Sequence, residues 1–264
     1  MFENTTLPDL IELKNVNQIY TDIKYPKGKI ILQDFNFLVE DKPGVGELIT
    51  ILGESGCGKS TILRYVSGLQ KPSSGEILIK GKPITDQDRV GMVFQQYSSF
   101  EWRTVLNNVG FGLELKGVPK SEREDRAMQM IKVVGLEGHE NKFAKYGPLS
   151  GGQLQRIAIA RSLLANPEML VMDEPFGALD IKTRLQMQNM LLDICQQVQA
   201  TILLVTHDVS EAVYLSDDIY IMSSNPGKII NHTKSPLSYP RNKDMKRTNQ
   251  FYDTVQHIEN IMEQ

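Results

Sequence analysis

The sequence predicts an α/β protein whose core is a mostly parallel β-sheet, and three observations lead to this class. Apolar runs of strand length recur along the chain. Helical patterns of more than ten residues separate several of these runs, as in sheets whose strands run parallel. Residues 98–165 lack convincing strand patterns, so we expect a helical block inserted between two parts of the sheet.

Size and composition limit the classes of protein that fit. The 264 residues suffice for one large domain, 41% are hydrophobic, 23% are charged, and the net charge is −3. Such a charge favours no nucleic-acid partner. The first ten residues lack the features of a secretory signal, no apolar run reaches the length of a membrane span, and two cysteines cannot form a disulfide framework. We therefore expect a cytoplasmic protein, and any role at a membrane must come through a partner.

Residues 10–97 are expected to hold the first strands. Loose alternation of apolar and polar residues predicts half-buried strands, and a continuous apolar run predicts a buried one. The predicted elements are strands at Leu10 to Tyr20, Ile30 to Val39 and Glu47 to Leu52, a helix from Lys59 to Leu69, a strand at Glu76 to Ile79, a turn at Lys80 to Pro83 and a strand at Gly91 to Phe94.

The remainder of the chain continues with helices and strands in alternation. Helices are expected over Val105 to Leu115, Glu122 to Val134 and Thr183 to Val198, and strands over Met169 to Met172, Thr201 to Val205 and Asp218 to Met222. In the tail, four apolar residues share one helical face, which favours packing over a partner-binding surface; they are Phe251, Val255, Ile258 and Met262. We expect a single domain over 1–264, with a core (10–97 and 166–224), a helical subdomain (98–165) and a C-terminal tail (225–264).

The segment GESGCGKST is the first candidate site. It fits the pattern of Gly, four residues, then Gly-Lys-Ser/Thr, and it stands between a predicted strand and a predicted helix. Glycines let backbone N–H groups surround a phosphate, Lys59 supplies an ammonium for the β- and γ-phosphates, and Ser60 supplies a hydroxyl for Mg²⁺. We interpret Cys57 as a small residue in a tight loop, with a redox switch as the alternative. The segment comprises Gly53, Glu54, Ser55, Gly56, Cys57, Gly58, Lys59, Ser60 and Thr61.

Two carboxylates follow the strand predicted at Met169 to Met172. Because side chains alternate along a strand, Asp173 and Glu174 can point in different directions, one toward a metal ion and the other toward a water molecule. Beside a phosphate-binding loop, Asp173 fits the acid that holds Mg²⁺, and Glu174 fits the group that orients or polarises the attacking water. The alternative is a solvated acidic end of a strand.

Two more polar residues follow predicted strands at the same expected edge of the sheet. His207 comes after the strand at Thr201 to Val205, where ligands collect in parallel sheets, and we interpret it as a γ-phosphate contact. Gln95 comes directly after the run Gly91 to Phe94, and its amide could reach the metal or the water from a hinge. A surface histidine and an ordinary glutamine are the alternatives.

A second anion-binding helix start is predicted within LSGGQLQRIAIAR, residues 149–161. Ser150, Gly151 and Gly152 stand directly before apolar residues at helical spacing, and Gln153 begins that stretch. The chain already has such a site about ninety residues earlier. The residues by themselves do not explain why it needs two.

In this order, GESGCGKST, VFQQ, LSGGQ, LVMDEP, GALD and VTHD resemble the nucleotide-binding subunit of ATP-binding cassette (ABC) transporters, over about Glu12 to Ser223. The resemblance implies a P-loop NTPase core with an antiparallel β subdomain and a helical signature subdomain, and ATP and Mg²⁺ as cofactors. It also implies that two copies face each other head to tail with two ATP molecules between them. Ser150, Gly151, Gly152 and Gln153 of one copy would then bind the γ-phosphate held by the other copy.

The resemblance also gives roles to single residues. Asp180 in GALD resembles the loop that communicates across the dimer interface, Gln95 matches the sensor between the two lobes, and Tyr20 takes the position of the aromatic residue that stacks on adenine. The alternative for Tyr20 is an ordinary strand-end tyrosine, and the long stretch TDIKYPKGK lets Tyr25 stack instead. The stretch SSFEWRTVLNNV resembles the surface where a membrane subunit docks, although its Trp102 can also be subdomain core.

Within this family, DEPFGALD, MSSNPGKI and YPR are similar to the nitrate, sulfonate and taurine importer group. The resemblance implies import of a small anion through integral membrane permease subunits, a periplasmic or lipid-anchored substrate-binding protein that acts indirectly, and a place at the cytoplasmic face of the membrane. Other importers, exporters and non-transport ABC ATPases share the same motifs and remain alternatives. The single copy and the modest acidity argue against ABC proteins of translation or DNA repair.

Overall fold

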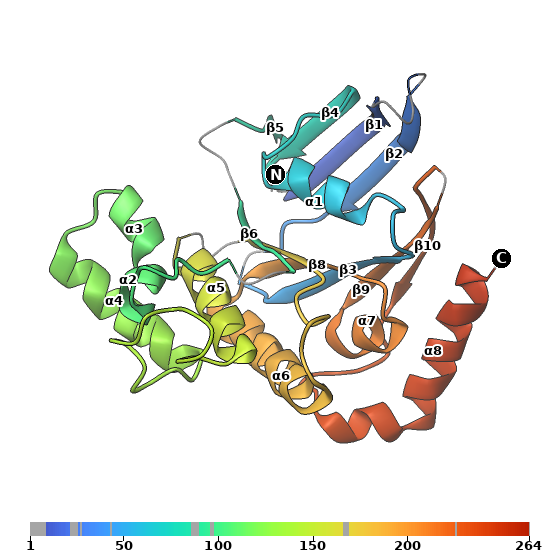
Figure 1. Ribbon diagram of the computed structural model, residues 1–264. Helices are drawn as coiled ribbons and strands as arrows, with labels where there is room; N and C mark the ends of the chain where they lie inside the picture. The colour runs from blue at the N-terminus through green and yellow to red at the C-terminus, as the bar shows by residue number, and fades with distance from the viewer. Residues whose placement is uncertain are drawn as a thin grey trace, which may run out of the picture.

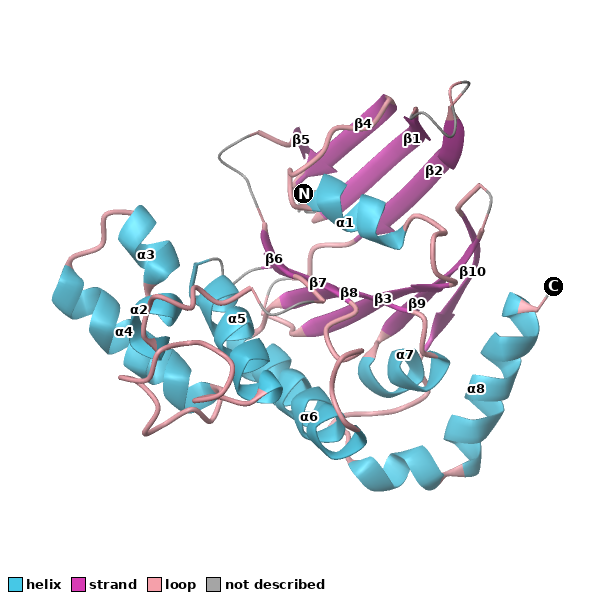
Figure 2. Ribbon diagram, in the orientation of Figure 1, coloured by secondary structure: helices cyan, strands magenta, loops and turns pink. Residues whose placement is uncertain are grey.

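Two β-sheets and a peripheral block of helices make up the fold of the computed structural model (Figure 1). The structure describes residues 9–21, 26, 28–42, 44–85, 90–95, 98–165, 169–224 and 226–263. Figure 2 shows the strands gathered in two layers, with most of the helices on the far side of the larger sheet from the smaller one.

The smaller sheet is antiparallel and has the strand order β2-β1-β4-β5. Residues along β2 alternate between buried and more exposed positions, so one face of this sheet packs on the core, as the sequence pattern predicts. β5 forms within the stretch where the sequence predicts a turn, because its two residues pair with the end of β4. The strands are β1 (Ile11–Tyr20), β2 (Lys29–Val39), β4 (Ser74–Ile79) and β5 (Lys82–Pro83).

The larger sheet has six strands in the order β10-β9-β3-β8-β7-β6. Its strands run parallel except β10, which pairs antiparallel with β9 at the edge. Every residue of β3 and β8 is buried, which explains why both appear in the sequence as apolar runs. The strands are β3 (Glu47–Gly53), β6 (Gly91–Val93), β7 (Met169–Asp173), β8 (Thr201–Thr206), β9 (Asp218–Ser223) and β10 (Lys228–Lys234).

Helix α1 (Lys59–Val66) lies between the two sheets (Figure 1). Its buried residues Ile62 and Leu63 belong to a hydrophobic core that includes Phe35 of the smaller sheet and Val205 of the larger one. The start of α1 therefore points at the carboxyl edge of β3, and its position is fixed by packing on both sides.

A second core fills the opposite face of the larger sheet and continues into the helical block. The four apolar residues of the C-terminal helix take part: Phe251, Val255 and Ile258 are buried and Met262 packs against the cluster, which confirms the packing role. The helices of this side are α2 (Val105–Val109), α3 (Phe111–Leu115), α4 (Lys120–Val133), α5 (Gly151–Ala165), α6 (Ile181–Val198), α7 (Val209–Leu215) and α8 (Asn249–Met262).

The C-terminal segment is held against the core by a buried arginine. After β10 the chain passes the short 3-10 helix η1 (Lys243–Arg247) before α8. The side chain of Arg241 is 1% exposed, and it donates to Asp217 Oδ1 at 2.7 Å and to backbone carbonyl oxygens, including that of Leu237 at 3.2 Å. Asp217 also accepts from the N–H of Leu48 at 2.9 Å, so one ion pair joins the tail to the start of β3.

Several elements differ from the sequence prediction. The helical stretch expected at Val105 to Leu115 is divided at Gly110 into α2 and α3. Neither α7 nor β10 was expected: α7 has seven residues, and β10 is a half-exposed edge strand that extends the sheet beyond the predicted end of the core at residue 224. Trp102 is 73% exposed, so the alternative that it belongs to the subdomain core is wrong.

No helix in the described part of the chain combines the length and the apolar character needed to cross a membrane.

Candidate functional site

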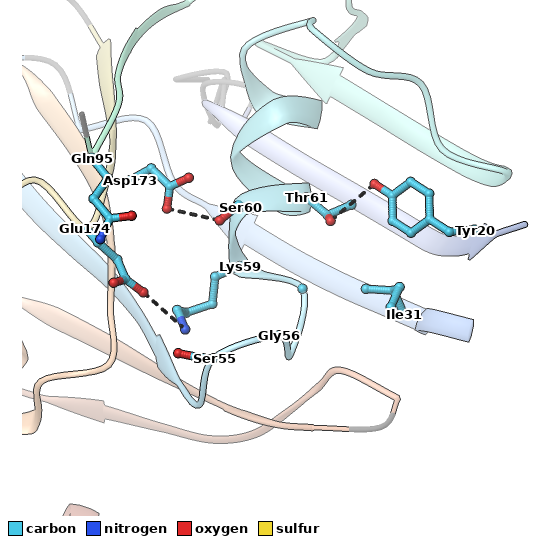
Figure 3. Close-up of a pocket in the computed structure, with 11 residues that line it drawn as sticks. Tyr20, Ile31, Ser55, Gly56, Lys59, Ser60, Thr61, Gln95, Asp173 and Glu174 are labelled. Atoms are coloured by element: carbon cyan, nitrogen blue, oxygen red, sulfur yellow. Dashed lines mark hydrogen bonds and ion pairs between the residues drawn. The ribbon is translucent and has the colours of Figure 1, made fainter. Parts of the chain in front are cut away.

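A cavity of about 400 Å³ opens at the N-terminus of α1, between the two sheets (Figure 3). It is polar on the side of the larger sheet, where side chains from the ends of two strands face the phosphate-binding loop. The described residues that line it are Tyr20, Ile31, Ser55, Gly56, Gly58, Lys59, Ser60, Thr61, Gln95, Asp173 and Glu174. Ten of these were predicted as site residues, and Ile31 was not.

The loop before α1 has the backbone of a phosphate cradle. Gly56 and Gly58 have φ values of 86° and 110°, a region that residues with a Cβ atom rarely adopt. A Cβ atom on Gly58 would lie 2.8 Å from Leu32 Cδ2, so the loop also needs glycine for its close approach to β2. These turns aim the first N–H groups of α1 at the cavity, where the helix dipole favours an anion.

Lys59 places a cation at the floor of this cavity. Its side chain is 5% exposed, and Nζ donates to the carbonyl oxygens of Gly53 at 2.7 Å and Glu54 at 2.9 Å. Nζ also lies 3.8 Å from Glu174 Oε1. The ammonium group is therefore folded across its own loop, held by partners that a phosphate group can replace.

Ser60 and Asp173 bring two oxygen ligands together at the same edge. Ser60 Oγ donates to Asp173 Oδ1 at 3.1 Å, which links α1 to the end of β7. Burial raises the pKa of Asp173, and the hydrogen bond from Ser60 partly opposes that change. No cluster of three or more His, Cys, Asp or Glu side chains among the described residues could hold a metal ion by itself. A metal here would therefore need the hydroxyl group and ligand oxygens as well.

Glu174 turns away from Asp173 through an unusual backbone conformation. Its φ is 43°, in the left-handed region, and its N–H donates to the carbonyl oxygen of Val205 on β8 at 3.0 Å. The carboxylate lies between two partners: Oε2 is 3.0 Å from His207 Nδ1, and Oε1 faces Lys59. The two carboxylates thus have separate partners, as predicted, but the reason differs: Glu174 lies just beyond the end of β7, and its left-handed backbone, not alternation along a strand, turns it away from Asp173.

The cavity's other side is formed by the smaller sheet. Tyr20, at the end of β1, is 36% exposed, and its hydroxyl group donates to Gln70 Oε1 at 3.0 Å and lies 3.4 Å from Thr61 Oγ1 (Figure 3). Ile31 of β2 lies on the same side and adds an apolar surface beside the tyrosine ring. The alternative residue Tyr25 falls outside the described residues.

Cys57 and Gln95 have different surroundings. Cys57 is 1% exposed, and burial raises the pKa of its thiol, with the charge of Lys59 acting in the opposite direction. These properties agree with a packed residue in the loop and disfavour a reactive thiolate at neutral pH.

Gln95 follows β6 and its side chain lies next to Asp173 and Glu174 in Figure 3.

The LSGGQ segment forms a helix start that the structure places outside this cavity. Ser150 Oγ accepts from the N–H of Gln153 at 3.4 Å, and Gln153 Oε1 accepts from the N–H of Ser150 at 2.9 Å. This reciprocal pair is a capping box at the start of α5. The nitrogen of the same side-chain amide, Gln153 Nε2, lies 3.0 Å from His139 Nε2, which ties the cap to the helical block. None of residues 150–153 is among the described residues that line the cavity.

Asp180 caps the next helix. Its carboxylate accepts from the N–H of Thr183 at 3.1 Å at the start of α6. The side chain of Thr183, together with this backbone bond, lowers the pKa of Asp180. The two helix starts are neighbours, because a Cβ atom on Gly152 would lie 2.6 Å from Thr183 Cγ2. Asp180 also lies outside the residues that line the cavity.

Two contributions to the site were missed in the sequence. Ile31 is one, and only its position on a strand next to the tyrosine could have indicated it. Gly227 is the other: its N–H donates to the carbonyl oxygen of Ile31 at 2.8 Å, and a Cβ atom there would lie 2.1 Å from the carbonyl oxygen of Cys57. The backbone at Gly227 thus packs against the phosphate loop at Cys57, a role that the turn sequence NPG does not reveal.

Comparisons with known proteins agree with this geometry. A family model described as ABC transporter matches residues 33–177. The nitrate import ATP-binding protein of Synechocystis sp. is 41% identical over 261 residues, covering 96% of this chain and 94% of that protein. The taurine import ATP-binding protein of Escherichia coli is 43% identical over 227 residues, covering 86% of this chain and 85% of that protein.

A solved structure extends the likeness to three dimensions. It is the dimeric post-hydrolysis state of an ATP-binding cassette bound to ADP and Pi, with a TM-score of 0.70 and 31% sequence identity over 86% of this chain and 100% of that one. The antiparallel sheet, the mostly parallel sheet and the helical block therefore form the P-loop NTPase fold of such cassettes. On this evidence the chain belongs to the ABC transporter family, as an ATP-binding subunit with the ATPase activity characteristic of that family.

Proposed function

We propose that this subunit binds Mg-ATP in the cavity at the start of α1 and hydrolyses it there. The observation that carries the proposal is the convergence on one cavity of three groups with separate chemistry: the Lys59 ammonium, the Ser60–Asp173 oxygen pair and the Glu174 carboxylate. His207 is not among the described residues that line the cavity, but it contacts this carboxylate from the adjacent turn. Phosphate binding, metal binding and activation of water are the three tasks of phosphoryl transfer to water.

The nucleotide lies with its base toward the smaller sheet. The exposed ring of Tyr20 stacks on adenine, with Ile31 beside it, and the phosphates enter the loop of residues 53–61. Lys59 exchanges its carbonyl partners in the loop for the β- and γ-phosphate oxygens. Since the loop is already curled around its glycines, binding needs little ordering of the backbone.

The residues present fit a magnesium ion. Mg²⁺ prefers oxygen ligands and is usually held by one or two carboxylates together with substrate phosphates. Ser60 Oγ and Asp173 Oδ1 are two such oxygens within 3.1 Å of each other, and the Gln95 amide is on the same wall of the cavity. The bound ion would neutralise charge that develops on the phosphate oxygens.

In this proposal Glu174 and His207 act on the water and the γ-phosphate. Glu174 orients or polarises the attacking water through one carboxylate oxygen, while His207 holds the other oxygen at 3.0 Å and contacts the γ-phosphate. The side-chain amide of Gln95, at the end of β6 next to the helical block, contacts the metal or the water.

The LSGGQ cap completes the site of a second copy. Ser150 and the first residues of α5 are not among the described residues that line the cavity of their own chain, and Asp180 caps the neighbouring helix. In a head-to-tail dimer these groups bind the γ-phosphate held by the partner, so ATP joins the two copies. This arrangement is supported by the dimeric, nucleotide-bound state of the similar cassette. It answers why one chain has two anion-binding helix starts.

The proposed cellular role is import of a small anion. Similarity to nitrate and taurine import ATP-binding proteins over most of the chain supports this substrate class. The subunit would sit at the cytoplasmic face of the membrane on integral permease subunits, and a substrate-binding protein would act on those. Binding of ATP favours the closed dimer and shifts the attached permease, and hydrolysis resets it.

The Glu174→Gln variant tests the site. Loss of the carboxylate should stop hydrolysis while leaving Lys59, Ser60 and Asp173 to bind Mg-ATP, so the variant should run as an ATP-bound dimer in size-exclusion chromatography. Glu263→Gln, an exposed change at the end of α8, should hydrolyse ATP normally and not be trapped. A Glu174→Gln protein that stays monomeric with Mg-ATP, or that turns over like the unmodified protein, would show that the assigned role is wrong.

A further inference from the structure

The turn that carries His207 is tied to one buried carboxylate. The N–H of Asp208 donates to Thr206 Oγ1 at 3.1 Å, and the N–H of Glu211 donates to Asp208 Oδ1 at 2.9 Å. The Thr206 side chain also acts on the Glu211 carboxylate and lowers its pKa, against the effect of burial. Glu211 thus interacts with both residues that flank His207: its N–H is bonded to Asp208, and its carboxylate is close to Thr206.

Glu211 has an unusual position for an acid. It is 5% exposed, and burial raises the pKa of its carboxyl group. Its Oε1 accepts from Gln188 Nε2 of α6 at 3.0 Å. A buried carboxylate is costly unless hydrogen bonds and charge compensate for the lost hydration. The amide of Gln188 supplies a hydrogen bond but no charge.

The compensating charge comes in part from the C-terminal segment. Lys246, in η1, donates from Nζ to Gln188 Oε1 at 2.9 Å, and its Nζ lies 4.2 Å from the centre of the Tyr214 ring. Asp208 and Glu211 both stabilise its charged form, while burial lowers its pKa. Arg184 of α6 also favours ionised Glu211. A chain of contacts thus leads from Lys246 through Gln188 and Glu211 to the His207 turn.

We propose that Lys246 is a positioning residue for ATP hydrolysis: acting through Gln188 and Glu211, it holds the turn that presents His207 to Glu174. The inference rests on the role of His207 proposed above. The C-terminal segment is then part of the hydrolysis machinery as well as a cover over α7. Lys246 does not line the ATP cavity, so it should affect the chemical step and not nucleotide binding.

The substitution Lys246→Met tests this with a side chain of similar length. It removes the donor from Gln188 Oε1 and one positive charge near Glu211, while Arg184 remains. We expect kcat to fall on the order of five-fold, the size of effect that contacts along such a network produce, with KM for ATP unchanged. Lys246→Arg keeps a charged donor and should restore most of kcat. Lys243→Met, an exposed change in the same 3-10 helix, should retain full activity.

A second pair of variants separates positioning from general destabilisation. If Lys246 acts through His207, Lys246→Met should have no further effect on single-turnover hydrolysis in a His207→Ala protein, because the group that it positions is absent. Equal fold-losses in both backgrounds, a rise in KM without loss of kcat, or unchanged kcat in Lys246→Met would overturn the proposal. If His207→Ala itself hydrolyses ATP normally, the proposed role of His207 fails instead, which is a separate result.

Discussion

Replacing Gly227 by alanine should disturb the phosphate loop from behind. Gly227 begins the approach to β10 and its N–H is bonded to β2 at Ile31. A Cβ atom there would lie 2.1 Å from the carbonyl oxygen of Cys57, 2.9 Å from Met222 Cε and 3.0 Å from Leu32 Cδ2. The two side-chain ends can move aside, whereas the Cys57 carbonyl belongs to the loop that binds phosphate. The substitution therefore acts on the loop backbone.

The size of the effect follows from this contact. Real Cβ contacts are essentially never shorter than 3.0 Å, so the loop or Gly227 must move by about 1 Å, a displacement that can cost on the order of 100-fold in an enzyme's rate. We expect kcat/KM for ATP to fall by about that factor, with part of the loss in nucleotide affinity, because the displaced N–H groups no longer match the phosphate oxygens.

Binding of a fluorescent ATP analogue and steady-state ATPase kinetics would measure both parts. Gly138→Ala is a matched control: Gly138 has a φ of 80° with no atom within 4 Å of the added Cβ, so this change introduces backbone strain far from the loop. It should lower the melting temperature and leave nucleotide affinity unchanged. A folded Gly227→Ala protein that binds and hydrolyses ATP within two-fold of the unmodified chain would refute the reasoning.

Three further outcomes are expected. Arg241→Met leaves Asp217 and the backbone carbonyl groups without the buried guanidinium, and it should lower the free energy of unfolding, measured in urea, by about 3 kcal/mol. Arg247→Met, a change at an exposed arginine, should alter that free energy by less than about 0.5 kcal/mol. Equal effects would contradict the assigned ion pair. Burial raises the pKa of Cys57, and raises that of Cys195 to about 12, so a thiol reagent at neutral pH should label neither in the folded protein and both after unfolding. Tyr20→Ala should weaken ATP binding about ten-fold and Tyr20→Phe much less, because the ring supplies the stacking surface; similar losses would assign the contact to the hydroxyl group.

The sequence predicted the parts of this fold whose signal is local. The strands β3 and β8 are continuous apolar runs because both of their faces are buried, and the phosphate loop has a fixed spacing of glycine, lysine and serine. Asp173 and Glu174 lie beside that loop, as the sequence predicted. The reason is that β7, which precedes the two acids, and β3, which precedes the loop, end at the same edge of the parallel sheet.

What the sequence could not predict depends on contacts between distant residues. The sequence of β10 shows little alternation of apolar and polar residues, because β10 is a half-exposed edge strand. Helix α7 is too short to show a helical period in its apolar residues. Nothing local marks Gly227 as the support of Cys57, which lies 170 residues earlier in the chain. Glu211 was missed for the same reason, since its partner Gln188 comes from α6, and Lys246 of the C-terminal segment reaches Gln188 only in the folded protein.

The capping box at Ser150 has a consequence for the energetics of association. Because Ser150 and Gln153 satisfy each other within a single copy, this end of α5 is already shaped before any partner arrives. Two copies can then meet without a folding step at the contact, and little of the affinity of the triphosphate is lost to immobilising protein. In Gln153→Ala, which loosens the cap, the start of α5 would have to become ordered each time two copies associate. This loss of conformational entropy would weaken the dimer, which would dissociate faster at the same nucleotide concentration.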